Sequence, residues 1–366
     1  MEPDRKTDVY AVIMAGGRGE RFWPQSRTSH PKQLLRLMGS LTMVEQAVER
    51  LCSFVAIENI IIVTNREYVN AMRQLLRRIP PENIIGEEFE RDTAPCMALA
   101  VGMIKRRSGG DPVIVVSPSD HIIRNLSGFR AVMEDAIAVA SERSELVLLG
   151  VQPRFANTGF GYIMPGGTID TVGGTEFRKV ERFVEKPDIA AAESFIESGG
   201  RWNSGLFVWR ASSVMEAMRE HAPELYSLAT QAAAFDGDGD ITVALSAAYE
   251  RIPKMSIDYA LIEKYPALVM AEADFDWEDV GSWSCIRSQT RPDGGNNAIR
   301  GLVATLDTKD CCIVSTPSHL VAAVDVEGLI IVHTDDATLI CAEHSAQRVK
   351  ELVEELGRNP ETRKFL

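Results

Sequence analysis

Residues 9–27 read VYAVIMAGGRGERFWPQSR, an apolar run followed by a glycine-rich segment. The first six residues form a continuous apolar run, which predicts a β-strand covered on both faces. Gly16, Gly17 and Gly19 follow, and they predict a turn whose backbone N–H groups approach phosphate oxygens closely. A P-loop pattern is absent, and the dinucleotide fingerprint fails because Phe22 stands where its third glycine should be.

The alternation of strand and helix patterns continues along the first half of the chain. Further apolar runs predict strands at residues 59–64, 112–116 and 145–149. Helical patterns lie between the runs, at residues 41–51, 67–78, 94–107 and 128–141. This order predicts an α/β fold with a doubly wound, mostly parallel sheet, on which ligands bind at the carboxyl ends of strands.

The regular alternation of strand and helix patterns ends at about residue 159. FGYIMP, FRKVERFVEKP and SGLFVWR each favour a strand, and residues 211–263 are mainly helical in pattern. A turn-rich break, RPDGGNN at residues 291–297, is followed by short strands and a final helix near residues 346–356. We therefore expect one domain over residues 1–290 and a small all-β domain over residues 291–366.

The composition and net charge of the chain argue against several classes of protein. The chain has 366 residues, 45% of them hydrophobic, which is typical of a globular protein with two domains. A net charge of −13 argues against a non-specific nucleic-acid binder. We expect no membrane span and no leader peptide at the acidic start. The six cysteines show no C-x-x-C spacing, which favours reduced thiols and a cytoplasmic location.

Basic residues gather around the glycine-rich turn although the protein as a whole is acidic. Arg18, Arg21 and Lys32 lie close to the glycines in sequence. A guanidinium such as that of Arg21 grips a phosphate bidentately, and Lys32 can act as a point charge. The alternative is a merely structural turn followed by a solvated basic loop.

Two acidic motifs could hold a divalent cation. Asp120 lies in SPSDH, directly after the strand predicted at residues 112–116, and Asp279 lies in WEDVGSW. Magnesium in proteins is held by one or two carboxylates together with substrate phosphates and waters. The alternatives are a turn or helix cap at Asp120 and a capped helix start at Asp279. His121, beside Asp120, is expected to be structural.

Three further motifs carry groups suited to a sugar phosphate. Glu185 and Lys186 stand side by side in FVEKP, where they could meet a hydroxyl and a phosphate or simply form a surface pair. Asn203 in WNSGLF is a donor and acceptor suited to hydroxyls, unless it only enters a strand. SIDYALIE looks architectural, although Asp258 within it could face the sugar.

In chain order, these motifs resemble those of the sugar-phosphate nucleotidyltransferases. The resemblance also includes RDTAPCMALA (residues 91–100), PSDHII, TGFGYI and IIVHTDDATLI, and it covers nearly the whole chain. It implies a nucleotidyltransferase domain, a left-handed β-helix-like C-terminal domain and a homodimer. The implied reaction transfers GMP from GTP to mannose 1-phosphate with Mg²⁺, and its products are GDP-mannose and pyrophosphate.

The same resemblance assigns roles to individual residues. The expected nucleotide-binding residues are Ala15, Gly16, Gly17, Arg18, Gly19, Arg21, Lys32, Arg91, Thr93, Ala94, Pro95 and Ser119, with residues 91–95 and Ser119 lining the base pocket. The expected sugar-phosphate-binding residues are Asp120, Gly161, Glu185, Lys186 and Asn203. The expected metal ligands are Asp120 and Asp279, which with Arg21, Lys32 and Lys186 make up the catalytic set.

The sequence departs from the family pattern at two places. Asp92 stands where the family usually has Asn, and Arg18 replaces a small residue. An acid beside a guanine pocket could tune base preference, so another nucleotide or another sugar, such as heptose or glucose 1-phosphate, is one alternative. A catalytically silent relative that senses GDP-mannose is the other. The charged residues of the catalytic set are all present, which argues against it.

Overall fold

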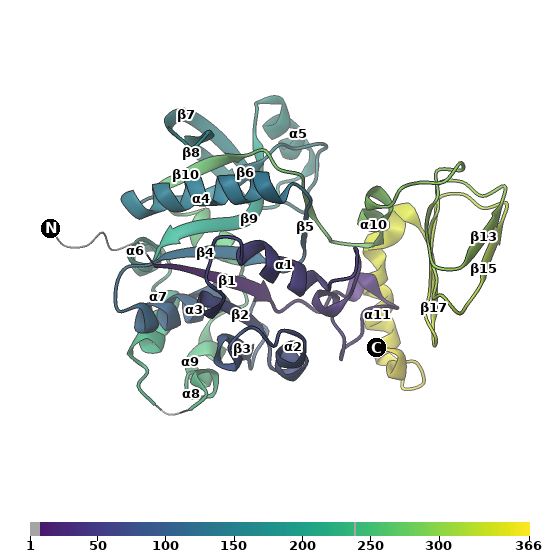
Figure 1. The fold of residues 1–366 in the computed structure, drawn as a ribbon, viewed down its shortest axis with the longest axis horizontal. Helices are drawn as coiled ribbons and strands as arrows, with labels where there is room; N and C mark the ends of the chain where they lie inside the picture. Colours follow the sequence, from purple (N-terminus) through teal and green to yellow (C-terminus); the bar gives the residue numbers. More distant parts are fainter. Residues whose placement is uncertain (1–7, 238) are drawn as a thin grey trace. The chain divides into compact units, whose positions relative to one another are not determined.

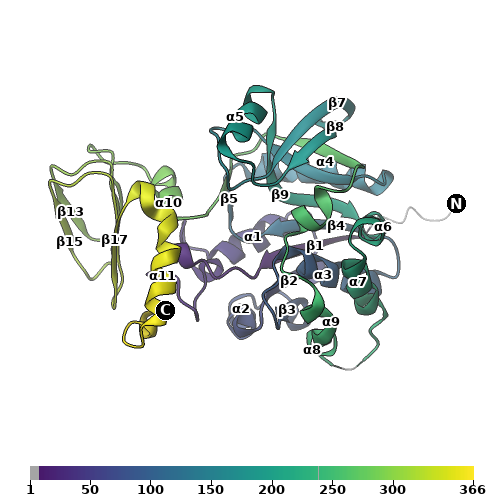
Figure 2. The ribbon, with the colours of Figure 1, turned by 180° about the vertical axis from the view of Figure 1, so that it is seen from behind.

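A computed structural model describes residues 8–237 and 239–366 (Figures 1 and 2). The start of the chain, at which no leader peptide is expected, lies outside these residues. The part up to Gly16 forms one compact unit with Ala47–Glu278, and Gly17–Gln46 forms a second unit with Asp279–Leu366. The domain boundary expected after residue 290 stays a prediction.

The first unit is built on a nine-stranded sheet in the order β3-β2-β1-β4-β9-β6-β10-β8-β7. Its strands are β1 (Val9–Ala15), β2 (Ile60–Asn65), β3 (Ile84–Glu87), β4 (Val113–Pro118), β6 (Leu146–Val151), β7 (Tyr162–Val172), β8 (Thr175–Val184), β9 (Arg201–Arg210) and β10 (Leu268–Ala273). The four strands predicted in the first half of the chain are confirmed as β1, β2, β4 and β6. The short strand β3 and the strand β10 were not predicted.

Seven of the nine strands run in the same direction, which confirms the mostly parallel sheet, while β8 and β9 run the other way. β1 is parallel to both neighbours, so that Val12 lies beside Ile61 on one side and Val116 on the other. β9 enters antiparallel between β4 and β6, and β8 runs antiparallel to β10. The apolar run of β9 predicted a strand but not its direction, because a buried strand has the same pattern in either direction.

Helices cover both faces of this sheet (Figure 1). They are α1 (Met43–Leu51), α2 (Val69–Leu75), α3 (Thr93–Ser108), α4 (Leu126–Glu142), α5 (Ile189–Glu197), α6 (Ala211–His221), α7 (Pro223–Ala234), α8 (Ile241–Ala244) and α9 (Ser246–Arg251). Val12 of β1 and Ile114 of β4 pack with α3, α6 and α7 in one core. The residues next to them along each strand point to the opposite face of the sheet. A side chain at Gly102 of α3 would collide with the backbone oxygen of Ala229, so this glycine allows α3 and α7 to approach closely.

In the second unit, alternate strands stack in parallel, and the last strand pairs antiparallel with the strand before it. Its strands are β12 (Ala298–Arg300), β13 (Val303–Leu306), β14 (Cys312–Val314), β15 (Val321–Val324), β16 (Leu329–His333) and β17 (Thr338–Ala342), and its helices are α10 (Trp283–Gln289) and α11 (Val349–Arg358). Val303 pairs with Val321, and Cys312 pairs with Ile330, in both cases 18 positions further on. A recurring offset of this kind is typical of a β-helix, and it confirms the predicted β-rich tail, although Ala298 and Cys312 pair at an offset of 14 positions.

Small and branched side chains fill the interior of these coils. Cys311, Ile313, Ala323 and Ile331 form a buried cluster.

All six cysteines of the chain are free thiols. Within the described residues, every helix is too short or too polar to cross a membrane.

Candidate active site

The glycine-rich turn begins where β1 ends. Ala15 is the last residue of β1, and its carbonyl accepts a hydrogen bond from the Thr64 hydroxyl of β2 (2.8 Å). The carbonyl of Met14 accepts a hydrogen bond from the backbone N–H of Ser119 (3.1 Å), which follows β4. Gly16 and Ser119 therefore leave the same edge of the sheet, the edge at which ligands bind on folds of this kind.

Gly19 brings the loop against Lys32. Its φ angle of 68° lies in the left-handed region, and a Cβ there would lie 2.4 Å from Cβ of Lys32. Only glycine fits such a position. The ammonium of Lys32 donates to the carbonyl of Val280 (3.3 Å), one residue after Asp279. Arg18 and Arg21 are exposed on the same loop.

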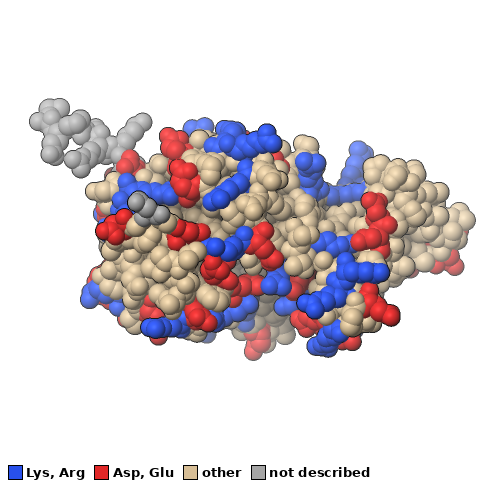
Figure 3. Space-filling view, turned by 90° about the horizontal axis from the view of Figure 1, so that it is seen from below, with Lys and Arg blue, Asp and Glu red and all other residues tan. Residues whose placement is uncertain are grey.

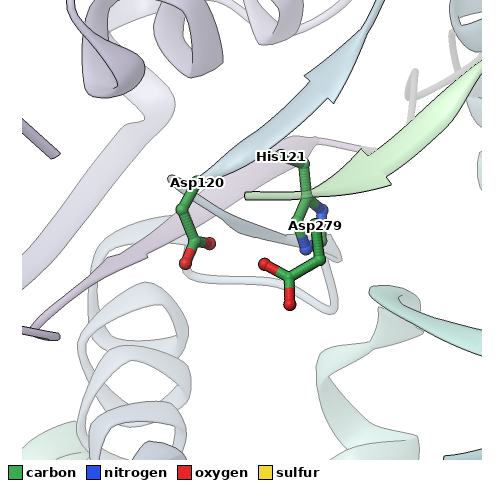
Figure 4. A group of neighbouring side chains, drawn as sticks. All are labelled: Asp120, His121 and Asp279. Atoms are coloured by element: carbon green, nitrogen blue, oxygen red, sulfur yellow. The ribbon is translucent and has the colours of Figure 1, made fainter. Parts of the chain in front are cut away.

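Two carboxylates and one imidazole form a candidate metal centre. Asp120 lies in the turn between β4 and β5 (His121–Ile123). Asp279 is the last residue of β11 (Trp277–Asp279), which pairs with β5. One potential ligand atom from each of Asp120, His121 and Asp279 lies within 4.8 Å of the others (Figure 4). The strand pairing of β5 and β11 accounts for this proximity.

The donor set fits a hard divalent cation held by the two aspartates. Carboxylate oxygens are the ligands that Mg²⁺ takes from proteins, usually one or two of them. The ring of His121 is buried edge-on against Trp277 (centroids 5.3 Å apart), and its Nδ1 accepts the indole N–H of Trp277 (3.3 Å). Glu278, the other acid of this motif, pairs with Arg154 (3.6 Å).

A second polar cluster contains the residues expected to bind the sugar phosphate. Asn203 of β9 donates from its backbone to the Gly161 carbonyl (2.8 Å) and from its side chain to Oδ1 of Asp258 (2.8 Å). Glu185 and Lys186 form an ion pair of 2.6 Å. A Cβ on Gly161 would lie 2.4 Å from Oε2 of Glu185, so glycine leaves room for this carboxylate.

Burial and mutual repulsion set the charge state of this second cluster. Burial raises the pKa of Glu185, although the ammonium of Lys186 opposes the shift. Burial also raises the pKa of Asp258, and the charge of Glu185 raises it further. Burial tends to lower the pKa of Lys186, but its hydrogen bond to Glu185 outweighs that effect and raises it. The cluster thus holds a cation beside two carboxyl groups with raised affinity for protons.

The segment expected to line the base pocket forms the start of α3. The Asp92 carboxylate caps this helix by accepting from the Thr93 N–H (2.8 Å), and its φ angle is 68°. With a ψ angle of −166°, Asp92 lies outside the left-handed helical region, in a conformation that residues other than glycine rarely adopt. The Thr93 hydroxyl accepts from the N–H of Ile257, the residue before Asp258. This contact ties the segment to the second cluster.

Sequence reasoning missed Glu87, a buried acid at the end of β3. Its Oε2 lies 3.3 Å from where a Cβ on Gly16 would stand, and the hydroxyl of Tyr249 donates to its Oε1. Burial raises the pKa of Glu87 to about 7, although the Tyr249 hydrogen bond opposes the shift. The signal in the sequence was weak, because the strand IIGE has only four residues.

Comparison with known proteins shows the family of both parts of the chain. The family model described as "Nucleotidyl transferase" matches residues 10–293, and the one described as "MannoseP isomerase/GMP-like beta-helix domain" matches residues 301–356. The first match spans more than half of the chain. The chain belongs to the nucleotidyl transferase family.

Alignments with individual relatives cover nearly the whole chain. The Xanthan biosynthesis protein XanB of Xanthomonas campestris pv. campestris is 39% identical over 97% of this chain and 75% of its own length. A mannose-1-phosphate guanylyltransferase of Escherichia coli is 38% identical over 96% of this chain and 74% of its own length. A crystal structure from Thermus thermophilus, described as a mannose-1-phosphate geranyltransferase, superposes with a TM-score of 0.85. It is 30% identical and covers 95% of this chain and 99% of that one.

The raised pKa of Glu87 predicts a pH-dependent stability. The pKa is about 7 in the folded protein, against an ordinary value of 4.5, so the contribution of Glu87 is complete below about pH 4.5 and is lost as the pH rises through 7. Between pH 5 and pH 8, we expect the wild type to lose about 2 kcal/mol more unfolding free energy than Glu87→Gln. Urea unfolding at both pH values measures this difference.

Glu88→Gln is the matched control, because Glu88 is the next residue and pairs at the surface with Arg66 (2.8 Å). Its unfolding free energy should follow that of the wild type at both pH values. Equal pH dependence in the wild type and in Glu87→Gln would contradict the prediction.

Proposed function

We propose that this protein transfers GMP from GTP to α-D-mannose 1-phosphate, forming GDP-mannose and pyrophosphate. What carries the proposal is the extent of the similarity to relatives named for this reaction, which includes both the sheet unit and the β-helix. The two polar clusters support it. One offers carboxylates to a divalent cation, and the other combines hydroxyl-binding oxygens with the ammonium of Lys186.

The nucleophile needs no general base. The second pKa of a phosphate monoester is about 6, so a sugar-phosphate oxygen is already anionic at neutral pH. This oxygen forms a new bond to the α-phosphorus of GTP as the bond to pyrophosphate breaks in line with it. The absence of a Ser/His or Cys/His pair from the candidate residues is consistent with this chemistry.

Repulsion between the two anionic substrates is the main obstacle. Two unit charges 4 Å apart repel by about 4 kcal/mol at an effective dielectric constant of 20. Lys186 would neutralise the sugar phosphate, while Arg21 and Lys32 would neutralise the triphosphate. The backbone of the glycine-rich turn would orient the triphosphate for in-line attack. Acidic and basic side chains are interspersed over the face in Figure 3, so this neutralisation is expected to be local.

Mg²⁺ is the proposed metal, held by Asp120 and Asp279. When bound, it supplies positive charge to phosphate oxygens during the transfer. The oxygen donors of the two aspartates support this choice, because they are the ligands that Mg²⁺ prefers.

A pyrophosphate-release assay tests the proposal. With Mg²⁺, the wild type should turn over GTP with mannose 1-phosphate faster than other nucleotides or than glucose and heptose 1-phosphates. In the same assay, Asp279→Asn should lower kcat about 100-fold or more, because it removes one metal carboxylate. Circular dichroism should show an unchanged fold.

Asp276→Asn is the control for that variant, since Asp276 pairs at the surface with Arg124 (2.7 Å) and should retain normal turnover. A preference for another substrate pair would favour a different transferase of the same family. Binding of GDP-mannose without turnover would favour a silent sensor. Near-normal kcat in Asp279→Asn at low Mg²⁺ would exclude the role given to Asp279.

Lys186→Ala should affect one substrate far more than the other. A hydrogen bond to a charged group contributes about 1.5–3 kcal/mol. We therefore expect KM for mannose 1-phosphate to rise about tenfold or more, while KM for GTP changes by less than about threefold. Lys179→Ala, an exposed lysine on β8, is the control. Equal effects of Lys186→Ala on both substrates would count against the assignment.

We also propose that the protein is a homodimer that uses an apolar face of the β-helix. Leu302, Leu306, Leu320 and Val324 are 48–60% exposed, and Leu306 lies directly beside Val324. Side chains that alternate along paired strands share one face, so these four form a contiguous apolar surface. Replacing Leu306 with Asp should produce monomers in sedimentation equilibrium, and a monomeric wild type would contradict the proposal.

The proposed location is the cytoplasm. Its support is the set of six free cysteines, which suit a reducing compartment. Cell fractionation tests this proposal, and recovery of the protein outside the cytoplasmic fraction would contradict it.

A further inference from the structure

Arg50 of α1 is a charged residue buried on the apolar face of a helix. Its side chain is almost inaccessible, with 5% of the residue exposed, and its neighbours Val48 and Leu51 on the helix are buried as well. Removing a guanidinium from water costs several kcal/mol unless its partners compensate. An apolar residue would fill the same space at a lower cost, so the charge itself needs an explanation.

The contacts of Arg50 point to the turn that carries Asp120. One terminal nitrogen of Arg50 donates to the backbone carbonyl of His121 (3.1 Å). The negative charge of Asp120 acts on the same guanidinium. Among the described residues, the Nε and the second terminal nitrogen of Arg50 find no hydrogen-bond partner. A buried donor left in this state is rare in folded proteins.

Two other contacts hold the same turn from different sides. The N–H of Ser119 is bonded to the Met14 carbonyl of β1, and the ring of His121 accepts the indole N–H of Trp277. Arg50 adds a third contact, from α1, and it brings a positive charge toward Asp120. The turn is thereby held through Ser119, through the His121 ring and through the His121 carbonyl.

We propose that Arg50 is a positioning residue that fixes the Ser119–His121 turn so that the Asp120 carboxylate faces the cation. This inference rests on the metal site of the proposed function. Partners behind a metal ligand restrict its orientation, and their loss typically costs 10–100-fold in metal affinity. Arg50 touches neither substrate nor metal in this role, because its side chain is buried beneath the turn.

The test compares Arg50→Met and Arg50→Lys with the wild type. Arg50→Met removes both the donor and the charge, whereas Arg50→Lys keeps the charge and loses the planar fork. Titration of the metal-free protein with Mn²⁺, followed by electron paramagnetic resonance, gives a dissociation constant that does not depend on turnover. We expect about tenfold weaker Mn²⁺ binding in Arg50→Met and an intermediate loss in Arg50→Lys.

Steady-state kinetics supply the second readout. The Mg²⁺ concentration for half-maximal rate should rise in Arg50→Met in parallel with the Mn²⁺ dissociation constant, while KM for GTP changes by less than about twofold. Arg78→Met is the matched control, because Arg78 is exposed and pairs with Glu49, which lies next to Arg50 on α1 (2.8 Å). Its metal binding should equal that of the wild type.

Three results would overturn the inference. Tighter Mn²⁺ binding in Arg50→Met would mean that Arg50 acts only as a charge that repels the cation. Unchanged Mn²⁺ binding with a lower melting temperature would mean that Arg50 only supports the fold. If Arg50→Met does not fold, unchanged Mn²⁺ binding in Arg50→Lys would overturn it instead. A wild type that binds Mn²⁺ through Asp120 but transfers no GMP would contradict the proposed function alone.

Discussion

The parallel pairing of β1 with β4 fixes the edge of the sheet on which the candidate site depends. Ile13 lies beside Ser117 and Met14 beside Pro118, so both strands end at the same level. The glycine-rich turn and the turn of Asp120 must therefore leave the sheet as neighbours. Separating them would break backbone hydrogen bonds in the buried centre of the sheet, where each lost bond leaves an unsatisfied polar group.

Two acids of the candidate site, Glu185 and Asp258, lie in an environment that disfavours their charged forms. Burial is the main cost of ionising Glu185 and Asp258, and the charge of Glu185 adds to that cost at Asp258. The Lys186 ammonium and the Asn203 amide offset part of this cost through hydrogen bonds of 2.6 and 2.8 Å. Perturbed groups of this kind cluster at functional sites, because the same desolvation that costs stability strengthens interactions with a charged ligand.

Much of the fold was predictable from the sequence, because apolar runs and glycines act locally. The run at residues 9–14 predicted β1, and Gly19 has the positive φ angle that a glycine-rich turn requires. The direction of β9 was not predictable, since a buried strand carries the same pattern both ways. Glu87 was missed because its strand is short, and the bond from Asn203 to Asp258 joins residues 55 positions apart.

From the sequence alone we could predict most of the strands and helices in order, the glycines that shape the first loop, and the motifs that carry charged groups. The proximity of Asp120 and Asp279 was expected from the motifs, whereas the bond from Asn203 to Asp258 and the bond from Arg50 to the carbonyl of His121 emerged only in the folded chain. The physical reason is range. Periodicity and backbone preference are properties of neighbouring residues, whereas desolvation and charge pairing depend on segments that meet only after the sheet has formed.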